Sequence, residues 1–175
     1  EHAARFSPPT SILAFNEIAM IKAAQHKPLD AIKAFQKAID SYDPNTTKER
    51  LVGSIYLNLG IYLNQMSMQE ESRQYLEKAI EEFRLDRAND SNAALTWSRL
   101  GESFGMIDDL NEAANAFAKA LVLEPKDMAT RNSYAHVLEF QGRIDEAITV
   151  TKTSIELASK SGDTVSVEEF TDYLK

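Results

Sequence analysis

"TWSRLGESFGMIDDLNEAANAFAKALVLEP", residues 96–125, decides the fold of this chain, because it sets bulky and very small residues at helical intervals. Positions 97, 100, 101 and 104 follow the spacing of one helix face, and positions 113, 117 and 120 repeat it. The acidic pair Asp108–Asp109 falls between the two faces, where a turn is expected. Gly101 and Ala113 let two helix axes approach to about 8 Å, the lower limit of helix packing. The stretch therefore predicts two short antiparallel helices.

The same arrangement occurs four times along the chain. The pair Leu100–Gly101 returns 34 residues later, and it has counterparts 41 and 82 residues earlier; these are Tyr134–Ala135, Leu59–Gly60 and Ile18–Ala19. One such helix pair cannot bury its apolar surface alone, whereas three or more stacked pairs can. The sequence therefore predicts an all-α fold built from repeated helix pairs.

Residues 94–127 resemble a tetratricopeptide repeat, whose signature is W-x2-L-G-x2-Y, then A-x3-F-x2-A, then P. The eight matching positions are Trp97, Leu100, Gly101, Phe104, Ala113, Phe117, Ala120 and Pro125. Weaker copies cover 12–45, 53–86 and 128–161, and they depart from the signature at Lys22, Ser72, Thr151 and Ser154. The resemblance implies an α-α superhelix, or solenoid, of four helix pairs over residues 11–161.

The expected helices are 11–25, 28–42, 47–65, 69–86, 93–106, 110–123, 127–140 and 144–159. Pro8 and Pro9 predict an irregular lead-in over residues 1–10. The two 41-residue offsets each add seven residues to the 34-residue unit, so part of each insertion should lengthen a helix and part a loop. Residues 162–175 are interpreted as a capping helix, with the start of a fifth repeat as the alternative.

Composition excludes several classes of function. The formal net charge of −8 argues against nucleic acid and anionic membranes as main partners. The chain has no cysteine and no stretch near 18 apolar residues, so we expect no disulfide, no cysteine metal site and no membrane insertion. Because the chain begins Glu1-His2, it reads as a processed protein or a piece of a longer one, soluble and either cytoplasmic or exported.

Motifs of catalysis are missing from the sequence. The three histidines are scattered, and neither a phosphate-binding loop nor a nucleophile elbow occurs. The acidic pairs Asp108–Asp109 and Asp145–Glu146 are interpreted as helix starts, where carboxylates meet the positive end of the helix dipole. We therefore expect no enzymatic role, no cofactor and no metal.

The resemblance implies that the first helix of each pair lines a concave groove that binds a peptide segment or partner protein. Carried over by position, the candidate partner-binding residues are Asn16, Met20, Leu57, Asn58, Ile61, Asn64, Ser98, Arg99, Glu102, Met106, Asn132, His136, Glu139 and Phe140. Their asparagines can donate to and accept from a peptide backbone. The alternative is that these side chains only make the surface polar and hydrated.

Some members of this family grip a chaperone's C-terminal carboxylate with two lysines, two asparagines and an arginine. Asn58 and Arg99 match that clamp, but Asn16, Met20 and Leu95 occupy its other positions, so both lysines are missing. We therefore expect no affinity for peptides that end in Glu-Glu-Val-Asp.

Met106 and Phe140 lie one helix pair apart, with Glu102, His136 and Glu139 nearby in the repeat register. This group predicts a ligand with an apolar side chain beside Lys or Arg; the alternative is that Phe140 packs under the following helix. The leading hypothesis is a non-catalytic adaptor. A self-assembling homo-oligomeric scaffold and a docking arm of a larger enzyme remain open.

Overall fold

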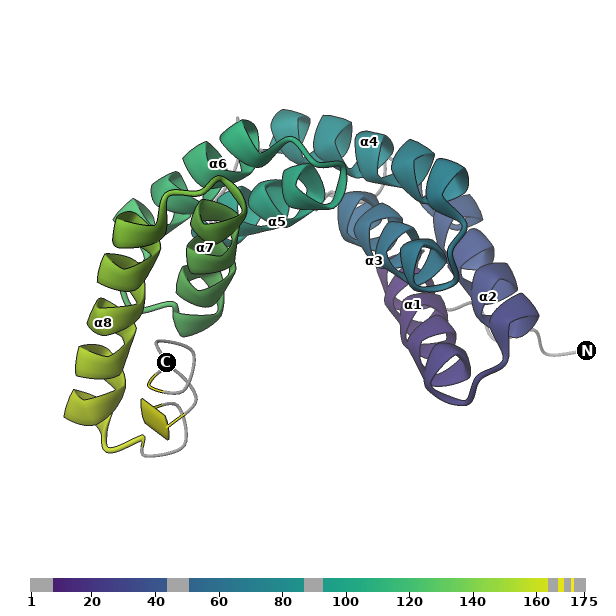
Figure 1. Ribbon diagram of the computed structural model, residues 1–175. Coiled ribbons are helices and arrows are strands. Elements are labelled where there is room, and N and C mark those ends of the chain that lie inside the picture. Colours follow the sequence, from purple (N-terminus) through teal and green to yellow (C-terminus); the bar gives the residue numbers. More distant parts are fainter. Residues whose placement is uncertain (1–7, 44–50, 87–92, 164–166, 169–170, 172–175) are drawn as a thin grey trace, which may run out of the picture. The chain divides into compact units, whose positions relative to one another are not determined.

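The computed structural model describes residues 8–43, 51–86, 93–163, 167–168 and 171, and every helix or strand within those ranges is an α-helix (Figure 1). The chain forms two compact units, Glu1–Asp86 and Arg87–Lys175. The first unit contains α1 (Pro8–Ala24), α2 (Pro28–Asp40), α3 (Leu51–Gln65) and α4 (Gln69–Asp86). The second contains α5 (Ala93–Met106), α6 (Leu110–Leu123), α7 (Met128–Phe140) and α8 (Ile144–Ser161). The predicted all-α fold of helix pairs is confirmed.

The helix boundaries agree with the sequence pattern except near some ends. Helices α4, α5 and α6 have the predicted bounds, whereas α1 begins at Pro8 and not at residue 11. The irregular lead-in therefore does not extend over residues 8–10, because proline in the first turn loses only an N–H that has no acceptor within the helix. The expected start of the third helix at 47 lies outside the described residues, as does most of the expected capping helix over 162–175.

The second insertion lengthens a helix, as predicted. Helix α4 has 18 residues, whereas its counterpart α6 has 14. The added length carries Phe83, which is 3% exposed and lies over Gly53 of α3. A Cβ at Gly53 would lie 3.0 Å from the Phe83 ring, so this glycine makes room for the extra turn.

Within each pair, the two helices are joined by the same tight turn. The turn residue has a left-handed backbone in all four pairs, with φ of 55° at His26, 62° at Ser67, 68° at Asp108 and 73° at Gly142. The residue after it donates its N–H to a carbonyl five positions earlier, at 2.9–3.0 Å in every pair. This hydrogen-bond pattern closes the C-terminus of the first helix and reverses the chain direction.

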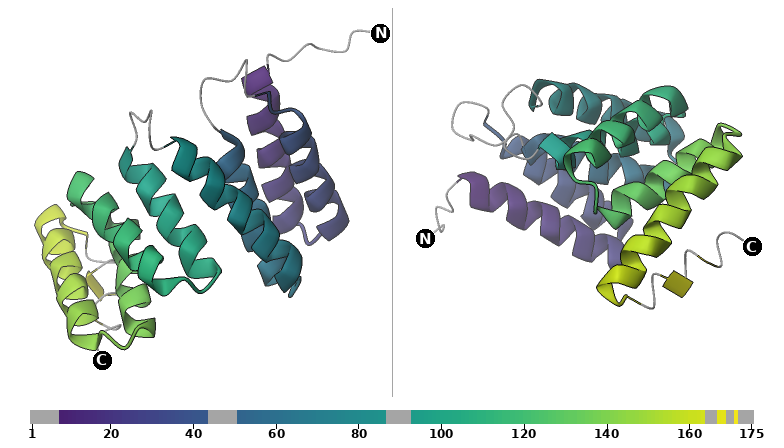
Figure 2. Two further views of the ribbon diagram at one scale, coloured as in Figure 1. Left: turned by 90° about the horizontal axis from the view of Figure 1, so that it is seen from above. Right: turned by 90° about the vertical axis from the view of Figure 1, so that its left-hand side faces the viewer.

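The first unit packs α1 against α2, α3 against α4, and α2 against α3 (Figures 1 and 2). Its core combines aliphatic side chains with small residues and one ring; its buried members are Ile12, Ala19, Ala34, Phe35, Ala38, Ile55, Leu59 and Leu63. Ser72 replaces the signature alanine of α4, and its hydroxyl donates to the Gly60 carbonyl at 2.7 Å. The polar substitution is therefore satisfied inside the core.

The second unit packs α5 against α6, α6 against α7, and α7 against α8. The close approach expected at Gly101 is confirmed, since a Cβ there would lie 2.7 Å from the Phe117 ring. Thr151 and Ser154 occupy the core positions of α8 at 2% and 1% exposure, and each hydroxyl donates to the carbonyl four residues earlier. The fourth repeat thus fills its core with polar side chains that bond to their own helix.

A lysine lies over an aromatic ring in each of the first three pairs, a contact that was not predicted from the sequence. Lys37 lies 5.9 Å from the Phe15 centroid, Lys78 lies 5.8 Å from that of Tyr56, and Lys119 lies 4.3 Å from that of Trp97. Both partners recur every 41 residues. The contact joins the second helix of each pair to the first, as a cation–π interaction of roughly 0.5–1 kcal/mol at an exposed site.

Candidate functional site

Helices α5 and α7 lie next to each other in the second unit with a fixed register. The Ser98 and Thr130 hydroxyl oxygens are 2.7 Å apart, and a Cβ at Gly105 would lie 3.9 Å from Val137. Both contacts join residues that are 32 positions apart in the sequence. The two helices are therefore parallel, and each residue of α5 lies beside the residue of α7 that is 32 positions later. Met106 is therefore level with residue 138, within one turn of Phe140.

The α5/α7 surface consists of Glu102, Met106, His136, Glu139 and Phe140, and it exposes large apolar side chains. Phe140 is 78% exposed and Met106 is 37% exposed. The alternative in which Phe140 packs under the following helix is therefore wrong, because α8 begins four residues later without covering the ring. Exposed apolar side chains that lie close together, as Met106 and Phe140 do, are typical of surfaces that bind a partner.

Carboxylates accompany these apolar side chains. The Glu139 carboxylate lies near the His136 ring, with 3.6 Å between the His136 Nδ1 and the Glu139 Oε2. Burial raises the pKa of the Glu102 carboxyl above its ordinary value, Arg99 opposes this rise, and Asp127 adds to it. A cation placed beside Glu102 would favour the ionised carboxylate and offset the cost of its burial.

Asp127 and Thr130 hold the start of α7 in place. The Asp127 carboxylate accepts from the backbone N–H groups of Ala129 and Thr130, and it also accepts from the Thr130 hydroxyl. Because a threonine hydroxyl has one proton, Ser98 is the donor in the bond between α5 and α7. This chain of bonds fixes the helix that carries Phe140.

Two of the predicted binding residues lie in the interior. Leu57 is 1% exposed and Ser98 is 7% exposed, so neither side chain can meet a partner in this structure. Leu57 is almost completely buried, and the Ser98 hydroxyl is used in the bond to Thr130. Family positions alone could not reveal this, because exposure depends on the neighbouring helix pair.

The first unit brings two of the predicted asparagines together. The Asn58 Nδ2 donates to the Asn16 Oδ1 at 3.2 Å, which links α3 to α1. The other predicted residues of this unit are Met20, 50% exposed, Ile61, half-buried, and Asn64, exposed. In the second unit, Arg99 is half-buried and Asn132 is exposed.

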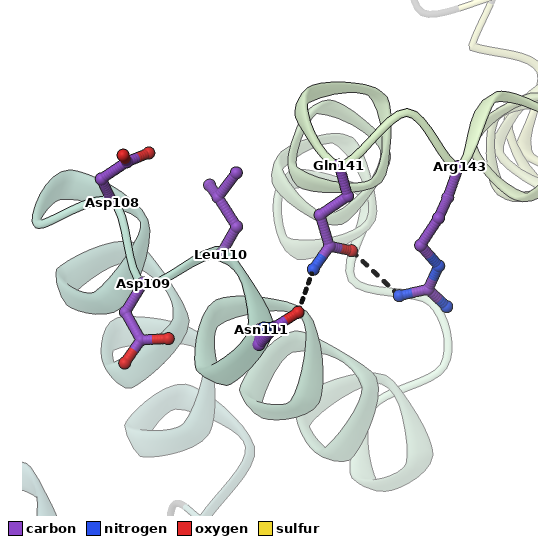
Figure 3. Close-up of a pocket in the computed structure, with 6 residues that line it drawn as sticks. All are labelled: Asp108, Asp109, Leu110, Asn111, Gln141 and Arg143. Atoms are coloured by element: carbon purple, nitrogen blue, oxygen red, sulfur yellow. Dashed lines mark hydrogen bonds between the residues drawn. The ribbon is translucent and has the colours of Figure 1, made fainter.

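A polar pocket of about 440 Å³, which was not predicted from the sequence, lies at the turns of the second unit. Its lining residues are Asp108, Asp109, Leu110, Asn111, Gln141 and Arg143 (Figure 3). The Gln141 amide joins the two turns, because it donates to Asn111 and accepts from Arg143, both at 2.9 Å. Asp109 also caps α6, as its position at a helix start predicted. The acidic pair was the one sequence signal for this pocket.

Within the described ranges, no group of three or more His, Cys, Asp or Glu side chains could hold a metal ion. Of the helices that the structure describes, none has the length and apolar character to cross a membrane.

Comparisons with known proteins agree with the repeat pattern. A tetratricopeptide repeat family model matches residues 10–84. The TPR repeat-containing protein MJ1428 of Methanocaldococcus jannaschii is 30% identical over 87 residues, which are 50% of this chain and 15% of that protein. The chain thus corresponds to a small part of that relative's length.

Solved structures share the fold at low sequence identity. BtubC (BKLC) from P. vanneervenii has a TM-score of 0.69 at 17% identity, over 92% of this chain and 68% of its own. Aspartyl phosphate phosphatase F from Bacillus subtilis has a TM-score of 0.65 at 18% identity, over 96% of this chain and 45% of its own. MamA has a TM-score of 0.57 at 18% identity, over 88% of this chain and 82% of its own.

At these identities the structural likeness concerns the fold alone. The family match and the repeat-containing relative add a likeness in sequence. Signature glycines also lie at the crossings of the second and third helix pairs, Gly60 against Leu76 and Gly101 against Phe117. Residues 10–84 therefore match the tetratricopeptide repeat family, and the helix pairs of residues 93–161 follow the same repeat pattern.

Proposed function

We propose that this chain is a non-catalytic protein interaction module that binds a peptide segment or partner protein, with the α5/α7 surface as its main contact. The observation that carries the proposal is the exposed Phe140, 78% accessible, next to Met106 and two carboxylates. Aromatic side chains anchor protein interfaces when a partner covers them. The repeat family, whose members bind proteins, supports the same function.

The partner of this surface carries an apolar side chain beside Lys or Arg. Methionine adapts to irregular apolar shapes, so Met106 and Phe140 accept the apolar group. Glu102 and Glu139 attract the cation on a chain whose net charge is already −8. Because this attraction acts partly through solvent, binding weakens as the salt concentration rises.

The asparagine pair of the first unit offers a second contact of a different kind. The bond between Asn58 and Asn16 uses one amide donor of Asn58 and the oxygen of Asn16. The Asn58 oxygen and the Asn16 amide donors are not consumed by it, and together they suit the backbone of an extended peptide. This pair therefore contributes backbone recognition, whereas the α5/α7 surface contributes the side-chain preference.

A peptide array tests this proposal. Fluorescent peptides that place Phe or Leu beside Lys or Arg are compared with peptides in which Glu replaces the basic residue. We expect Phe140→Ala and Glu102→Lys each to weaken binding of the basic peptides by about tenfold, or ~1.4 kcal/mol. The matched control is Val122→Ala, which removes an exposed apolar side chain, 79% accessible, from α6 and leaves the α5/α7 surface intact.

The fold of each variant is checked by circular dichroism and thermal unfolding. If both α5/α7 variants keep the parent affinity while their helices remain folded, the binding surface lies elsewhere and the proposal fails. If Val122→Ala loses as much peptide affinity as the two α5/α7 variants, the substitutions act on the second unit as a whole and not on a contact with the peptide.

A further inference from the structure

The first helix pair exposes apolar side chains at the end where α1 turns into α2. Ile21 in the last turn of α1 is 56% exposed, and Leu29 in the first turn of α2 is 72% exposed. Ile18, on the preceding turn of α1, is 42% exposed. Its counterpart Leu59, 41 residues later, is 1% exposed because the first pair covers it. Among the described residues, nothing covers Ile18 in the same way.

This end of the molecule is also basic, although the whole chain is acidic. Residues 17–33 carry three lysines, Lys22, Lys27 and Lys33, against two acids, Glu17 and Asp30, while the chain has a net charge of −8. Lys22 follows Ile21 directly, and Lys27 lies two residues before Leu29. The α1–α2 end, defined as Ile18, Ile21, Lys22, Lys27, Leu29 and Lys33, therefore presents aliphatic side chains beside cations.

The α5/α7 surface has the opposite character. It offers Met106 and Phe140 together with Glu102 and Glu139, so it fits an aliphatic side chain flanked by a lysine. We infer that the α1–α2 end of one chain docks on the α5/α7 surface of a second copy; this inference rests on the proposed function and names the partner of that surface. A second copy fits this surface because the lysines of its α1–α2 end complement the carboxylates of the α5/α7 surface, and because both surfaces expose apolar side chains.

The two surfaces are different patches of the same chain, so the contact is heterologous. Each copy keeps one free surface after the first contact forms, and association continues head to tail. The product is an open chain of copies or a closed ring. Because lysines face carboxylates across the contact, added salt weakens it.

The test uses the full chain, with mass measured by light scattering over a range of concentrations. At low salt we expect the apparent mass to rise with concentration, and at high salt to fall toward that of one chain. Ile21→Asp places a carboxylate in the α1–α2 end and should abolish docking by that end. Phe140→Asp does the same to the α5/α7 surface. We expect each variant alone to have the mass of a single chain, whereas the control Val122→Asp associates like the parent.

Mixing the two defective variants provides the sharper result. Each variant keeps the surface that the other lacks, so an equimolar mixture forms one intact contact and reaches the mass of two chains without growing further. Circular dichroism of each variant shows that its helices are intact. A second pair, Lys27→Glu and Glu139→Lys, tests the charges without touching the apolar side chains, and the mixture of these two restores association.

A parent chain that keeps the mass of one copy at every concentration and salt level overturns the inference. So does association that survives Phe140→Asp, since that outcome points to pairing of α1–α2 ends with each other. Neither result affects the proposed function, which depends on whether Phe140→Ala binds the basic peptides more weakly than the parent chain does. If those peptides bind normally to Phe140→Ala, the proposed function fails independently of any self-association.

Discussion

The turn positions show how single residues act in this chain. His26, Ser67, Asp108 and Gly142 occupy the same place in the four pairs, and all have a left-handed backbone. Glycine adopts this conformation without a steric penalty, whereas a side chain costs about 1 kcal/mol or more. Three of the four turns therefore hold a residue that their backbone does not favour.

Ser67→Gly is expected to stabilise the first unit. The substitution relieves the contact of the Ser67 Cβ with its own backbone, and the exposed hydroxyl takes part in no hydrogen bond that fixes the turn. We expect a gain of about 0.5–1 kcal/mol in the free energy of unfolding, measured by denaturant titration. The reverse change at the equivalent position, Gly142→Ser, should lose a similar amount, and changes of the same sign at both sites would contradict this account.

Glu102 links the stability of the fold to pH. Its raised pKa means that the folded state favours the protonated carboxyl more than the unfolded state does. At a pH below the pKa of Glu102 in the unfolded chain, the carboxyl is protonated in both states and its burial does not reduce stability. As the pH rises from there through the higher pKa of the folded state, the free energy of unfolding decreases. Glu102→Gln removes this titration.

We therefore expect Glu102→Gln to be more stable than the parent at neutral pH and equally stable at low pH. The measurement is thermal unfolding of both proteins across the acidic range. A parent chain that gained stability relative to Glu102→Gln as the pH rose would contradict the direction of the pKa shift. Glu139→Gln, on the exposed side of the same surface, serves as the control.

At the scale of helices, two glycines on α5 have opposite roles. A Cβ at Gly101 would lie 2.7 Å from the Phe117 ring, whereas one at Gly105 would meet nothing closer than 3.9 Å. The first glycine sets the distance between α5 and α6. The second only adds conformational entropy to the unfolded chain.

Gly101→Ala should therefore destabilise the second unit and Gly105→Ala should stabilise it. Overpacking at the crossing costs about 1–3 kcal/mol, and Gly101→Val costs more than Gly101→Ala. Alanine at Gly105 gains at most about 1 kcal/mol from helix propensity. Lys22→Ala, at the half-buried counterpart of Phe104 in the first pair, should change little. Unfolding midpoints in denaturant separate these variants, and equal midpoints for Gly101→Val and Lys22→Ala would show that the repeat register is wrong.

At the scale of the whole molecule, the pattern of charges determines which ligands are excluded. The α1–α2 end is basic while the chain as a whole carries −8. The positions that would hold two lysines for a terminal carboxylate have other residues, and Asn58 donates to Asn16 instead. A terminal carboxylate would therefore lose charge-assisted hydrogen bonds of roughly 1.5–3 kcal/mol each.

Peptides that end in Glu-Glu-Val-Asp should accordingly not bind in the micromolar range. Fluorescence anisotropy with such a peptide measures this, and the basic peptides of the array serve as the positive control. Micromolar binding that disappears in Arg99→Ala would show that a carboxylate site exists despite the missing lysines.

The helices and their pairing could be predicted from the sequence because both depend on local spacing. Apolar positions at helical intervals fix each helix, and Gly101 opposite Phe117 fixes the crossing, so α4, α5 and α6 have their expected bounds. The repeat period then assigned equivalent roles to residues 34 or 41 positions apart. Asp109 as a helix cap followed from the same local rules.

Exposure was decided only by the tertiary structure, because it depends on which side chains a neighbouring helix pair covers. Leu57 and Ile61 both read as surface positions, yet Leu57 is buried and Ile61 is half-buried. The packing of α7 against α5 hides Ser98, whereas none of the helices α1–α8 covers the Phe140 ring, which is 78% exposed. The joining of Asn111 and Gln141 across two turns likewise requires residues 30 positions apart to meet. The periodic pattern gives the spacing of equivalent residues along the chain. It does not give the contacts between helices, and these contacts determine which side chains can reach a partner.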